Sequence, residues 1–202
     1  MTIRLVLADD QALVRGAIAA LLGLEPDLEV VAEVGSGDEA VAAVAEHAPD
    51  VALLDVEMPG LDGIEAARQI RERSPGTRVL MVTTFGRPGY LKRALQAGAS
   101  GFVVKETPAA QLADAVRRVH QGLRVVDPGL AMDSLTTGDS PLTPRETEVL
   151  QAARDGASVA VIASRVHLSE GTVRNHLSAA IGKTGAGNRA EAVLVSVENG
   201  WL

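Results

Sequence analysis

Short apolar runs alternate with helical patterns from residue 3 to about residue 122, and this alternation limits the fold more than any other feature. The apolar runs predict strands at residues 3–8, 29–34, 51–54, 78–83 and 101–104. The intervals between them predict helices at residues 11–23, 37–47, 61–73, 87–97 and 108–121. Continuous apolar strands separated by helices are typical of a parallel sheet that is covered on both faces. The sequence therefore predicts an α/β fold with a doubly wound (βα)5 parallel sheet.

A second, all-helical part follows a turn-rich stretch. Residues 123–140 are rich in Gly, Pro, Asp, Ser and Thr, and we interpret them as a linker between domains at residues 1–122 and 141–202. Thr143 and Glu146 have capping-box spacing, which predicts a helix that ends near residue 154. Three further helices are predicted from the candidate caps Ser158, Ser169 and Asn188. The short turn between the second and third of these four helices predicts a helix-turn-helix.

Composition excludes several classes of protein. The chain has 202 residues, of which 47% are hydrophobic, but no apolar run approaches the roughly 18 residues of a membrane span. The absence of cysteine excludes disulfides and thiolate metal sites. The start of the sequence runs directly into the first predicted strand, so we expect no signal peptide, no membrane insertion and a cytoplasmic location.

Charge is divided unevenly along the chain. The net charge is −7, with 13 Lys and Arg against 20 Asp and Glu in residues 1–140, and six of each sign in residues 141–202. Proteins that bind nucleic acid are expected to carry a basic patch. The absence of net charge in residues 141–202 is therefore an argument against DNA binding by this part of the chain.

Acidic side chains lie where predicted strands end. Asp9 and Asp10 follow residues 3–8, Asp55 follows residues 51–54, and Lys105 follows residues 101–104. The carboxyl ends of parallel strands share one edge of a sheet, where α/β proteins place their sites. Two carboxylates 4 Å apart repel by roughly 4 kcal/mol at an effective dielectric of about 20, and a divalent cation offsets this repulsion. Oxygen ligands favour Mg²⁺.

The same groups can handle a phosphoryl group. Asp10 and Asp55 are the preferred Mg²⁺ ligands, with Asp9 acting directly or through water and the Glu57 backbone carbonyl completing the set. Asp55 is the candidate nucleophile, because carboxylates form aspartyl-phosphates. Lys105 and the Thr83 hydroxyl can bind phosphoryl oxygens. A single acid at a strand end is usually a helix cap or a solvated charge, but four suitable groups at one edge favour a site.

The second helix of the predicted helix-turn-helix has a core face and a polar face. Val173, Leu177 and Ile181 fall on one side and are expected in the core. The candidate DNA contacts are Arg174, Asn175 and Ser178 toward base edges, and Thr172, Lys183 and Arg189 toward phosphates. Arg reads guanine and Asn reads adenine in the major groove. The alternative is a helical protein-interaction module with a solvated polar face.

Together these residues resemble a two-component response regulator of the NarL/FixJ class. Residues 9–10 look like the acidic pair of its receiver domain and residues 55–60 (Asp-Val-Glu-Met-Pro-Gly) like its phospho-acceptor segment. Thr83, Phe102 and Lys105 look like its switch hydroxyl, switch aromatic and lysine. Residues 142–150 and 169–178 look like its LuxR-type DNA-binding domain. The resemblance implies a flavodoxin-like receiver with strand order 2-1-3-4-5 and covers nearly the whole chain.

The resemblance also implies a mechanism. A sensor histidine kinase phosphorylates Asp55, Thr83 and Phe102 shift toward the phosphoryl group, and the receiver dimerises. The dimer then presents two recognition helices to an operator in double-stranded DNA, with RNA polymerase as a further partner in transcription control. Residues 83–91 and 200–202 are similar to regulators paired with membrane-fluidity sensors.

One segment departs from the family pattern. Gly182 and Thr184 stand where the family usually has a basic residue and a leucine. A helical Gly costs about 1 kcal/mol relative to Ala, so we expect the recognition helix to end near Ile181 and to make few phosphate contacts. Binding by the isolated domain should then be weak and salt-dependent.

Two other functions compete with this interpretation. An Asp nucleophile with Mg²⁺ also serves phosphatases of the haloacid-dehalogenase type, but these carry a second Asp where this chain has Glu57, and the chain lacks a cap domain. A regulator that binds DNA without control by phosphorylation is the milder alternative. The complete acidic set is an argument against it.

Overall fold

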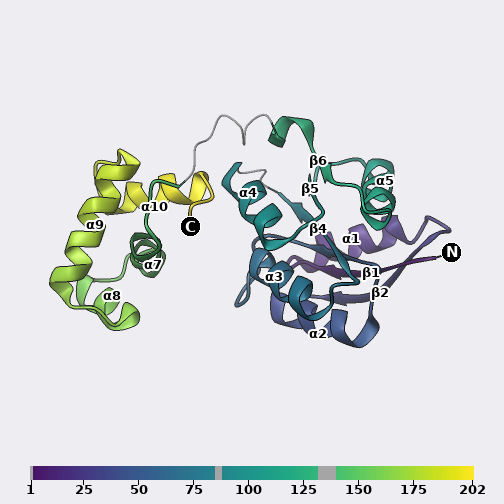
Figure 1. The fold of residues 1–202 in the computed structure, drawn as a ribbon, viewed down its shortest axis with the longest axis horizontal. Coiled ribbons are helices and arrows are strands. Elements are labelled where there is room, and N and C mark those ends of the chain that lie inside the picture. The colour runs from purple at the N-terminus through teal and green to yellow at the C-terminus, as the bar shows by residue number, and fades with distance from the viewer. Residues whose placement is uncertain (1, 85–87, 132–139) are drawn as a thin grey trace. The chain divides into compact units, whose positions relative to one another are not determined.

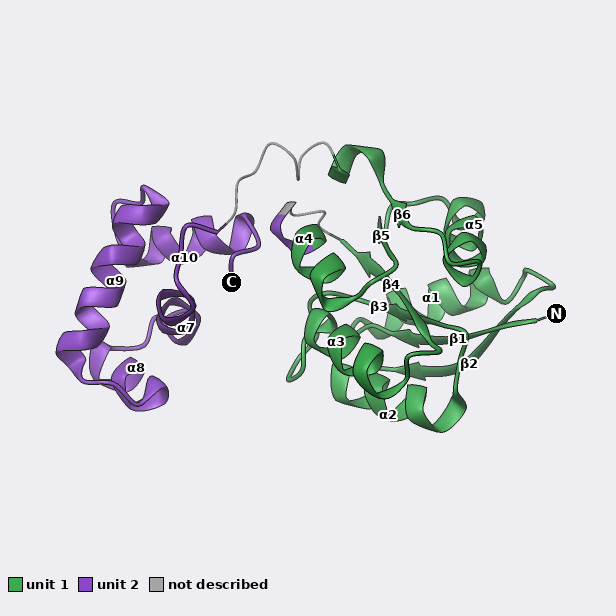
Figure 2. Ribbon diagram, in the orientation of Figure 1, with its two compact units in different colours: residues 1–86, 91–132 green, residues 87–90, 133–202 purple. Residues whose placement is uncertain are grey.

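The computed structural model describes residues 2–84, 88–131 and 140–202. The chain divides into two compact units, residues 1–86 with 91–132 and residues 87–90 with 133–202 (Figure 2). The first unit is the α/β part and the second is the helical part.

The first unit confirms the predicted doubly wound sheet. Its strands are β1 (Ile3–Ala8), β2 (Leu28–Val34), β3 (Val51–Leu54), β4 (Arg78–Thr83) and β5 (Gly101–Val104). Its helices are α1 (Ala12–Leu22), α2 (Gly37–His47), α3 (Gly63–Arg73), α4 (Pro88–Ala97), of which residues 91–97 belong to this unit, and α5 (Ala109–His120). The strands are parallel and lie in the order β2-β1-β3-β4-β5. Each strand therefore delivers the residue after it to the same edge.

A sixth strand extends the sheet beyond the five that the sequence predicts. In β6 (Val125–Val126), Val125 pairs with Gly101 and Val126 with Phe102. Two residues give no periodic signal, so the sequence analysis places them in the linker at 123–140. The beginning of that stretch thus belongs to the sheet, while residues 132–139 lie outside the described residues, as do residues 85–87 within the segment 83–91.

Helices cover both faces of the sheet (Figure 1). α1 and α5 pack on one face, where Leu5 and Leu7 of β1 join a core with Ile18 and Val116. Successive strand side chains point to opposite faces, so Val6 and its neighbours of the same parity turn toward the side of α2 and α3. Burial on both sides explains why the inner strands β1, β3, β4 and β5 are mainly apolar without alternation, whereas the edge strand β2 carries the exposed Glu29 and Glu33.

The second unit is a bundle of four capped helices. They are α7 (Pro144–Ala152), α8 (Val159–Val166), α9 (Glu170–Thr184) and α10 (Arg189–Glu198). Each is preceded by a residue whose side chain accepts a hydrogen bond from the first turn: Thr143, Ser158, Ser169 and Asn188. The Thr143 and Glu146 capping box is present as predicted. These caps satisfy backbone donors that a helix start leaves open.

The recognition helix is longer than predicted. We expected it to end near Ile181, but α9 continues through Gly182 to Thr184. Gly185, with φ of 68°, ends it in the left-handed conformation that glycine adopts without strain. The core side chains Val173, Leu177 and Ala180 hold the helix against the bundle, and this packing outweighs the low helix propensity of Gly182.

Candidate functional site

Asp9, Asp10 and Asp55 form one acidic cluster at the carboxyl edge of the sheet. One carboxylate oxygen from each lies within 4.8 Å of the others. Asp9 is 1% exposed and Asp55 is 4% exposed, whereas Asp10 faces solvent. The cluster is thus half buried and open on the side of Asp10.

Lys105 bridges the two buried acids. Its Nζ lies 2.7 Å from Asp9 Oδ2 and 2.8 Å from Asp55 Oδ2. The Lys105 backbone N–H donates to the Thr83 carbonyl at 2.8 Å, which ties the end of β5 to the end of β4. The structure therefore places Lys105, the predicted phosphate ligand, in direct contact with the predicted nucleophile Asp55 and with the metal-ligand candidate Asp9.

The pKa values of both Asp55 and Lys105 are raised, but for different reasons. Burial raises the pKa of the Asp55 carboxyl above its ordinary value, against the lowering effect of Lys105, and the charge of Asp9 adds to the rise. Burial acts to lower the pKa of Lys105, but its hydrogen bonds to Asp55 and Asp9 raise it. Lys105 therefore stays charged, and ionised Asp55 is a costly group that gains from any further cation.

Backbone contacts fix the position of Asp55. Its N–H donates to the Ala8 carbonyl at 2.9 Å, and its Oδ1 accepts from the Val56 N–H at 2.7 Å. Its carbonyl lies against the start of α3, where a Cβ on Gly63 would come within 1.8 Å of the oxygen. Only glycine fits there, a requirement that the spacing of residues in the sequence does not show.

Arg15 is a second residue that the sequence analysis did not single out. It lies on α1, and its Nη1 donates to the Asp9 carbonyl at 2.5 Å. The Asp9 side chain in turn accepts from the Gln11 N–H at 2.9 Å. These bonds hold the segment that presents Asp9 and Asp10. An arginine five residues after an acidic pair carries no recognisable signal on its own.

Thr83 and Phe102 lie inside the unit. Thr83 ends β4 and is 2% exposed, and Phe102 of β5 is fully buried with its backbone paired to Met81. Glu57 lies two residues beyond Asp55 with an exposed side chain. Thr83 ends β4 and Asp55 directly follows the neighbouring strand β3, so both residues lie at the carboxyl edge of the sheet.

The donor set fits a hard divalent cation. Three carboxylates supply only oxygen ligands, which favours Mg²⁺ or Ca²⁺ over softer metals. Lys105 neutralises part of the charge of Asp9 and Asp55, while the Asp10 side chain makes no hydrogen bond or ion pair within the described ranges. A cation near Asp10 would balance the remaining negative charge.

The polar face of α9 is the second candidate site. Arg174, Asn175 and Ser178 are exposed, and Arg174 Nη2 pairs with Glu170 Oε2 at 2.7 Å. The Thr172 hydroxyl lies 2.8 Å from Ser169 Oγ at the helix start. These residues share the outer side of the helix.

Lys183 and Arg189 make contacts within the helical unit. Lys183 Nζ lies 2.9 Å and 2.8 Å from the two carboxylate oxygens of Glu146, which is buried. Arg189 donates to the carbonyls of Ala157 at 2.7 Å and Gly156 at 3.2 Å. Both side chains thus tie helices or loops together, so a phosphate group would have to share them with these partners.

Both parts of the chain match known families. Residues 5–117 match the response regulator receiver domain, and residues 140–196 match the bacterial regulatory proteins of the luxR family. The transcriptional regulatory protein DesR of Bacillus subtilis is 42% identical over 200 residues, covering 99% of each chain. The response regulator VraR of Staphylococcus aureus is 36% identical over the full length of both. The crystal structure of the response regulator ChrA superposes with a TM-score of 0.60 at 32% identity, covering 100% of this chain and 99% of that one.

The chain therefore belongs to the two-component response regulators that join a receiver domain to a LuxR-type helix-turn-helix. It is a response regulator transcription factor and not a conventional enzyme, which removes the phosphatase interpretation. None of the helices in the described part of the chain is long and apolar enough to cross a membrane.

Proposed function

We propose that a sensor histidine kinase phosphorylates Asp55 and that this modification controls DNA binding by α9. The observation that carries the proposal is the contact of Lys105 with both Asp55 and Asp9 beside an open Asp10. Asp9, Asp10, Asp55 and the Glu57 backbone carbonyl would hold Mg²⁺. Bound there, the ion would shield the carboxylates from the incoming phosphoryl group and stabilise its developing charge.

The two carboxylate oxygens of Asp55 have different partners. Oδ1 is fixed by the Val56 N–H, and Oδ2 is paired with Lys105. When one carboxylate oxygen attacks phosphorus, the bond from phosphorus to the donor breaks and the donor leaves with its electron pair. Lys105 Nζ can then follow the negative charge from Asp55 to a phosphoryl oxygen, and the Thr83 hydroxyl binds another.

Thr83 connects this event to the rest of the receiver. It ends β4, whereas Phe102 is buried on the neighbouring strand β5. Movement of Thr83 toward a phosphoryl oxygen vacates space at the end of β4, and we propose that Phe102 repacks in response. A buried aromatic ring cannot shift without changing its neighbours, because protein interiors are close-packed.

The proposed output is operator binding by a homodimer. Arg174, Asn175 and Ser178 would read bases in double-stranded DNA, with Thr172 on a phosphate and Lys183 and Arg189 as shared phosphate contacts. Residues 141–202 have no net charge, so one copy of this domain should bind DNA weakly. Linking two copies can raise affinity by roughly 10²–10⁴ without new contacts.

Several finer assignments belong to the same proposal. They are a receiver that runs from residue 1 through β6, a linker that follows β6, a DNA-binding domain of residues 141–202, a cytoplasmic location and contact with RNA polymerase during transcription control. A kinase that senses membrane fluidity is the proposed source of phosphate. The relatives DesR and YvfU, both of Bacillus subtilis, are 42% and 40% identical, so identity alone does not separate subgroups.

The phosphorylation step is tested by intact mass after incubation with acetyl phosphate, with and without Mg²⁺. We expect one phosphoryl adduct that needs Mg²⁺, is absent from Asp55→Asn and persists in Asp114→Asn, which changes an exposed Asp on α5. Light scattering of the same samples should show a dimer only with the adduct. An adduct that survives Asp55→Asn would move the site elsewhere.

The output step is tested with operator DNA selected from a random pool by the phosphorylated protein. Arg174→Ala and Asn175→Ala should each weaken binding by roughly tenfold, the value of one base contact. Arg145→Ala is the control, because Arg145 forms an exposed pair with Glu148 on α7 much as Arg174 does with Glu170 on α9. Equal affinity with and without the adduct would favour a regulator that is independent of phosphorylation.

A further inference from the structure

Three arginines surround a hollow at the edge of the sheet opposite to the acidic site. Arg71 lies on α3, Arg78 is the first residue of β4, and Arg124 directly precedes β6. They line a hollow of about 400 Å³ together with Ser100, and no carboxylate is part of the lining. Because Thr83 ends the strand that Arg78 begins, the length of β4 separates this hollow from the acidic cluster.

Two glycines give these arginine side chains their places. Gly98 and Gly122 follow the ends of α4 and α5 with φ of 103° and 88°, a conformation that favours glycine. A Cβ on Gly98 would lie 2.2 Å from Arg71 Cδ, and one on Gly122 would lie 3.2 Å from an Arg78 guanidinium nitrogen. Arg71 and Arg78 therefore occupy space beside the backbone that a side chain at Gly98 or Gly122 would crowd.

The simplest alternative is that these arginines serve only the nearby helix ends. A helix C-terminus carries about half a negative charge, so the ends of α4 and α5 together supply about one. Arg71 Nη1 reaches the Gln96 carbonyl at 3.4 Å, which is long for a hydrogen bond. Among the described residues, Arg78 and Arg124 make no side-chain hydrogen bond or ion pair. Three positive charges thus exceed what the helix ends neutralise.

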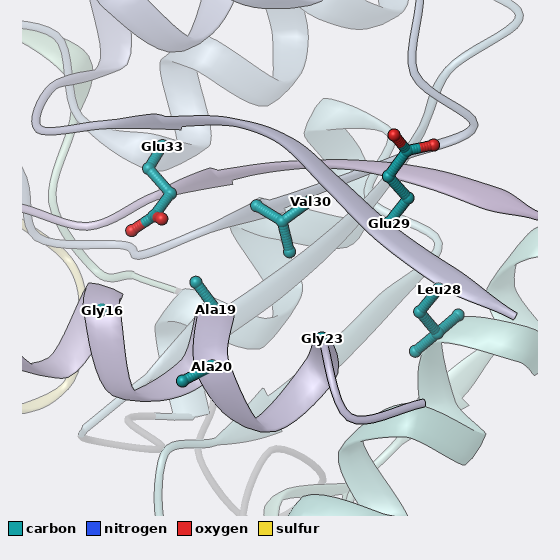
Figure 3. Close-up of a pocket in the computed structure, with 8 residues that line it drawn as sticks. All are labelled: Gly16, Ala19, Ala20, Gly23, Leu28, Glu29, Val30 and Glu33. Atoms are coloured by element: carbon teal, nitrogen blue, oxygen red, sulfur yellow. The ribbon is translucent and has the colours of Figure 1, made fainter. Parts of the chain in front are cut away.

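Another hollow of the same unit has the opposite character. It measures about 500 Å³, lies between α1 and β2, and carries Glu29 and Glu33 among small side chains (Figure 3). Acids outnumber bases by 20 to 13 in residues 1–140, so an acidic lining is what this composition favours. A hollow lined by three arginines and no acid therefore differs from what this acidic composition favours.

We propose that the arginine hollow, formed by Arg71, Arg78, Arg124 and Ser100, binds a compact anion with two linked phosphate groups. Guanidinium groups match phosphate oxygens in pairs, and the hollow is larger than one phosphate fills. Its lining contains no aromatic ring on which a base could stack, so the phosphates are the part recognised. The source is either free diphosphate or the phosphate tail of a nucleotide. This proposal does not depend on phosphorylation of Asp55.

The test is a titration of the ¹⁵N-labelled full chain with inorganic pyrophosphate and, separately, with ADP. Divalent cations are left out, so that the acidic cluster repels both anions. We expect saturable shifts of the Gly98, Ser100 and Gly122 amides. Similar affinity for the two ligands would identify the diphosphate group as sufficient, and tighter binding of ADP would point to a nucleotide; both results support the site.

Charge-removing variants separate a built site from general attraction. Arg78→Gln and Arg124→Gln should each weaken pyrophosphate binding about tenfold, the value of a charge-assisted hydrogen bond. Arg73→Gln is the matched control, since Arg73 is also exposed near the end of α3 but lines a hollow between α2 and α3. It should change the affinity less than about twofold, as an isolated surface charge does.

Three results would overturn the proposal. They are a titration without saturation, equal weakening by Arg73→Gln and Arg78→Gln, and shifts confined to the amides of Asp9 and Asp10. Loss of operator binding in Arg78→Gln without any pyrophosphate binding would reassign the arginines to DNA.

Discussion

Asp55 combines a chemical role with an energetic cost at a single position. It is nearly buried, and its carboxyl pKa is raised because burial outweighs the help of Lys105. A raised carboxyl pKa means that the folded state binds the proton more tightly than the unfolded state. Ionised Asp55 therefore lowers the stability of the folded receiver at neutral pH. This cost is relieved as the pH falls through the raised pKa of Asp55 and the carboxyl becomes protonated.

Asp55→Asn should consequently stabilise the receiver at pH 7. The gain should be on the order of 1 kcal/mol, a typical single-residue effect. Lys105 keeps its contact with Asp9 at 2.7 Å in the variant. The measurement is urea unfolding of both proteins between pH 7 and pH 4. The difference between their unfolding free energies should shrink as the pH falls toward 3.8, the ordinary pKa of Asp. A gap that widens on acidification would contradict the argument.

Gly63→Ala should damage the same site through the backbone. The added Cβ would come within 1.8 Å of the Asp55 carbonyl oxygen, so β3 or α3 has to move. We expect a loss of about 1–3 kcal/mol in unfolding free energy, together with slower phosphorylation by acetyl phosphate. Gly76→Ala is the control, because no atom lies within 4 Å of its would-be Cβ. Equal behaviour of the two variants would show that the contact is unimportant.

At this scale the sequence predicts which side chains lie at the acidic edge of the sheet better than it predicts the residues that support them. The positions of Asp9, Asp10, Asp55, Thr83 and Lys105 follow from the apolar strands that each of them follows or ends. The sequence does not indicate Gly63 and Arg15, because their roles depend on three-dimensional contacts with the backbone of Asp55 and Asp9. A close approach of two backbones leaves no mark on hydrophobic spacing.

Among the elements, α9 shows how tertiary packing overrides local propensity. Gly182 lies inside the helix with no other atom within 4 Å of a would-be Cβ, and Gly185 ends it with positive φ. Gly182→Ala should therefore raise the unfolding free energy by about 0.5–1 kcal/mol, whereas Gly185→Ala should lower it by about 1–2 kcal/mol. Thermal unfolding of residues 141–202 measures both. Stabilisation by both variants would show that the helix end is not fixed by Gly185.

The start of α7 depends on a buried acid. Glu146 accepts from the Thr143 N–H at 2.7 Å and from Lys183 of α9 at 2.8 Å, so it joins two helices. Glu146→Ala removes the cap and the pair together and should cost about 2–3 kcal/mol. Glu148→Ala loses only an exposed pair with Arg145 and should cost less than about 1 kcal/mol. If chemical denaturation shows similar losses of unfolding free energy for the two variants, the buried contacts of Glu146 contribute no more stability than the exposed pair of Glu148.

Element prediction succeeded where periodicity was long and failed where length or packing decided the outcome. The five strands and the capped helix starts follow from apolar runs and from Thr143, Ser158, Ser169 and Asn188. β6 has two residues, too few for a period. The extension of α9 beyond Ile181 depends on core contacts of Val173 and Leu177 that no local propensity contains.

Each of the two units has its own buried core among the described residues. In the first unit one cluster joins α1 and α5 to the sheet, and Val6 and Ile70 are buried on the side of α2 and α3. In the second unit α7, α8, α9 and α10 meet around Val149, Leu150 and Ile162. We expect residues 141–202 to fold alone, with a cooperative thermal transition seen by circular dichroism. A domain of about 60 residues buries little surface, so its stability should be modest. A fragment without a cooperative transition would show that it needs the receiver.

The outer strands of the sheet have a consequence for handling the protein at high concentration. An unpaired strand edge is a template on which another chain can add, and this is a route to aggregation. β2, with seven residues, carries the exposed charges of Glu29 and Glu33, and β6 at the opposite edge is only two residues long. The charges on β2 protect one outer strand and the short length of β6 protects the other, so the receiver should resist irreversible strand addition.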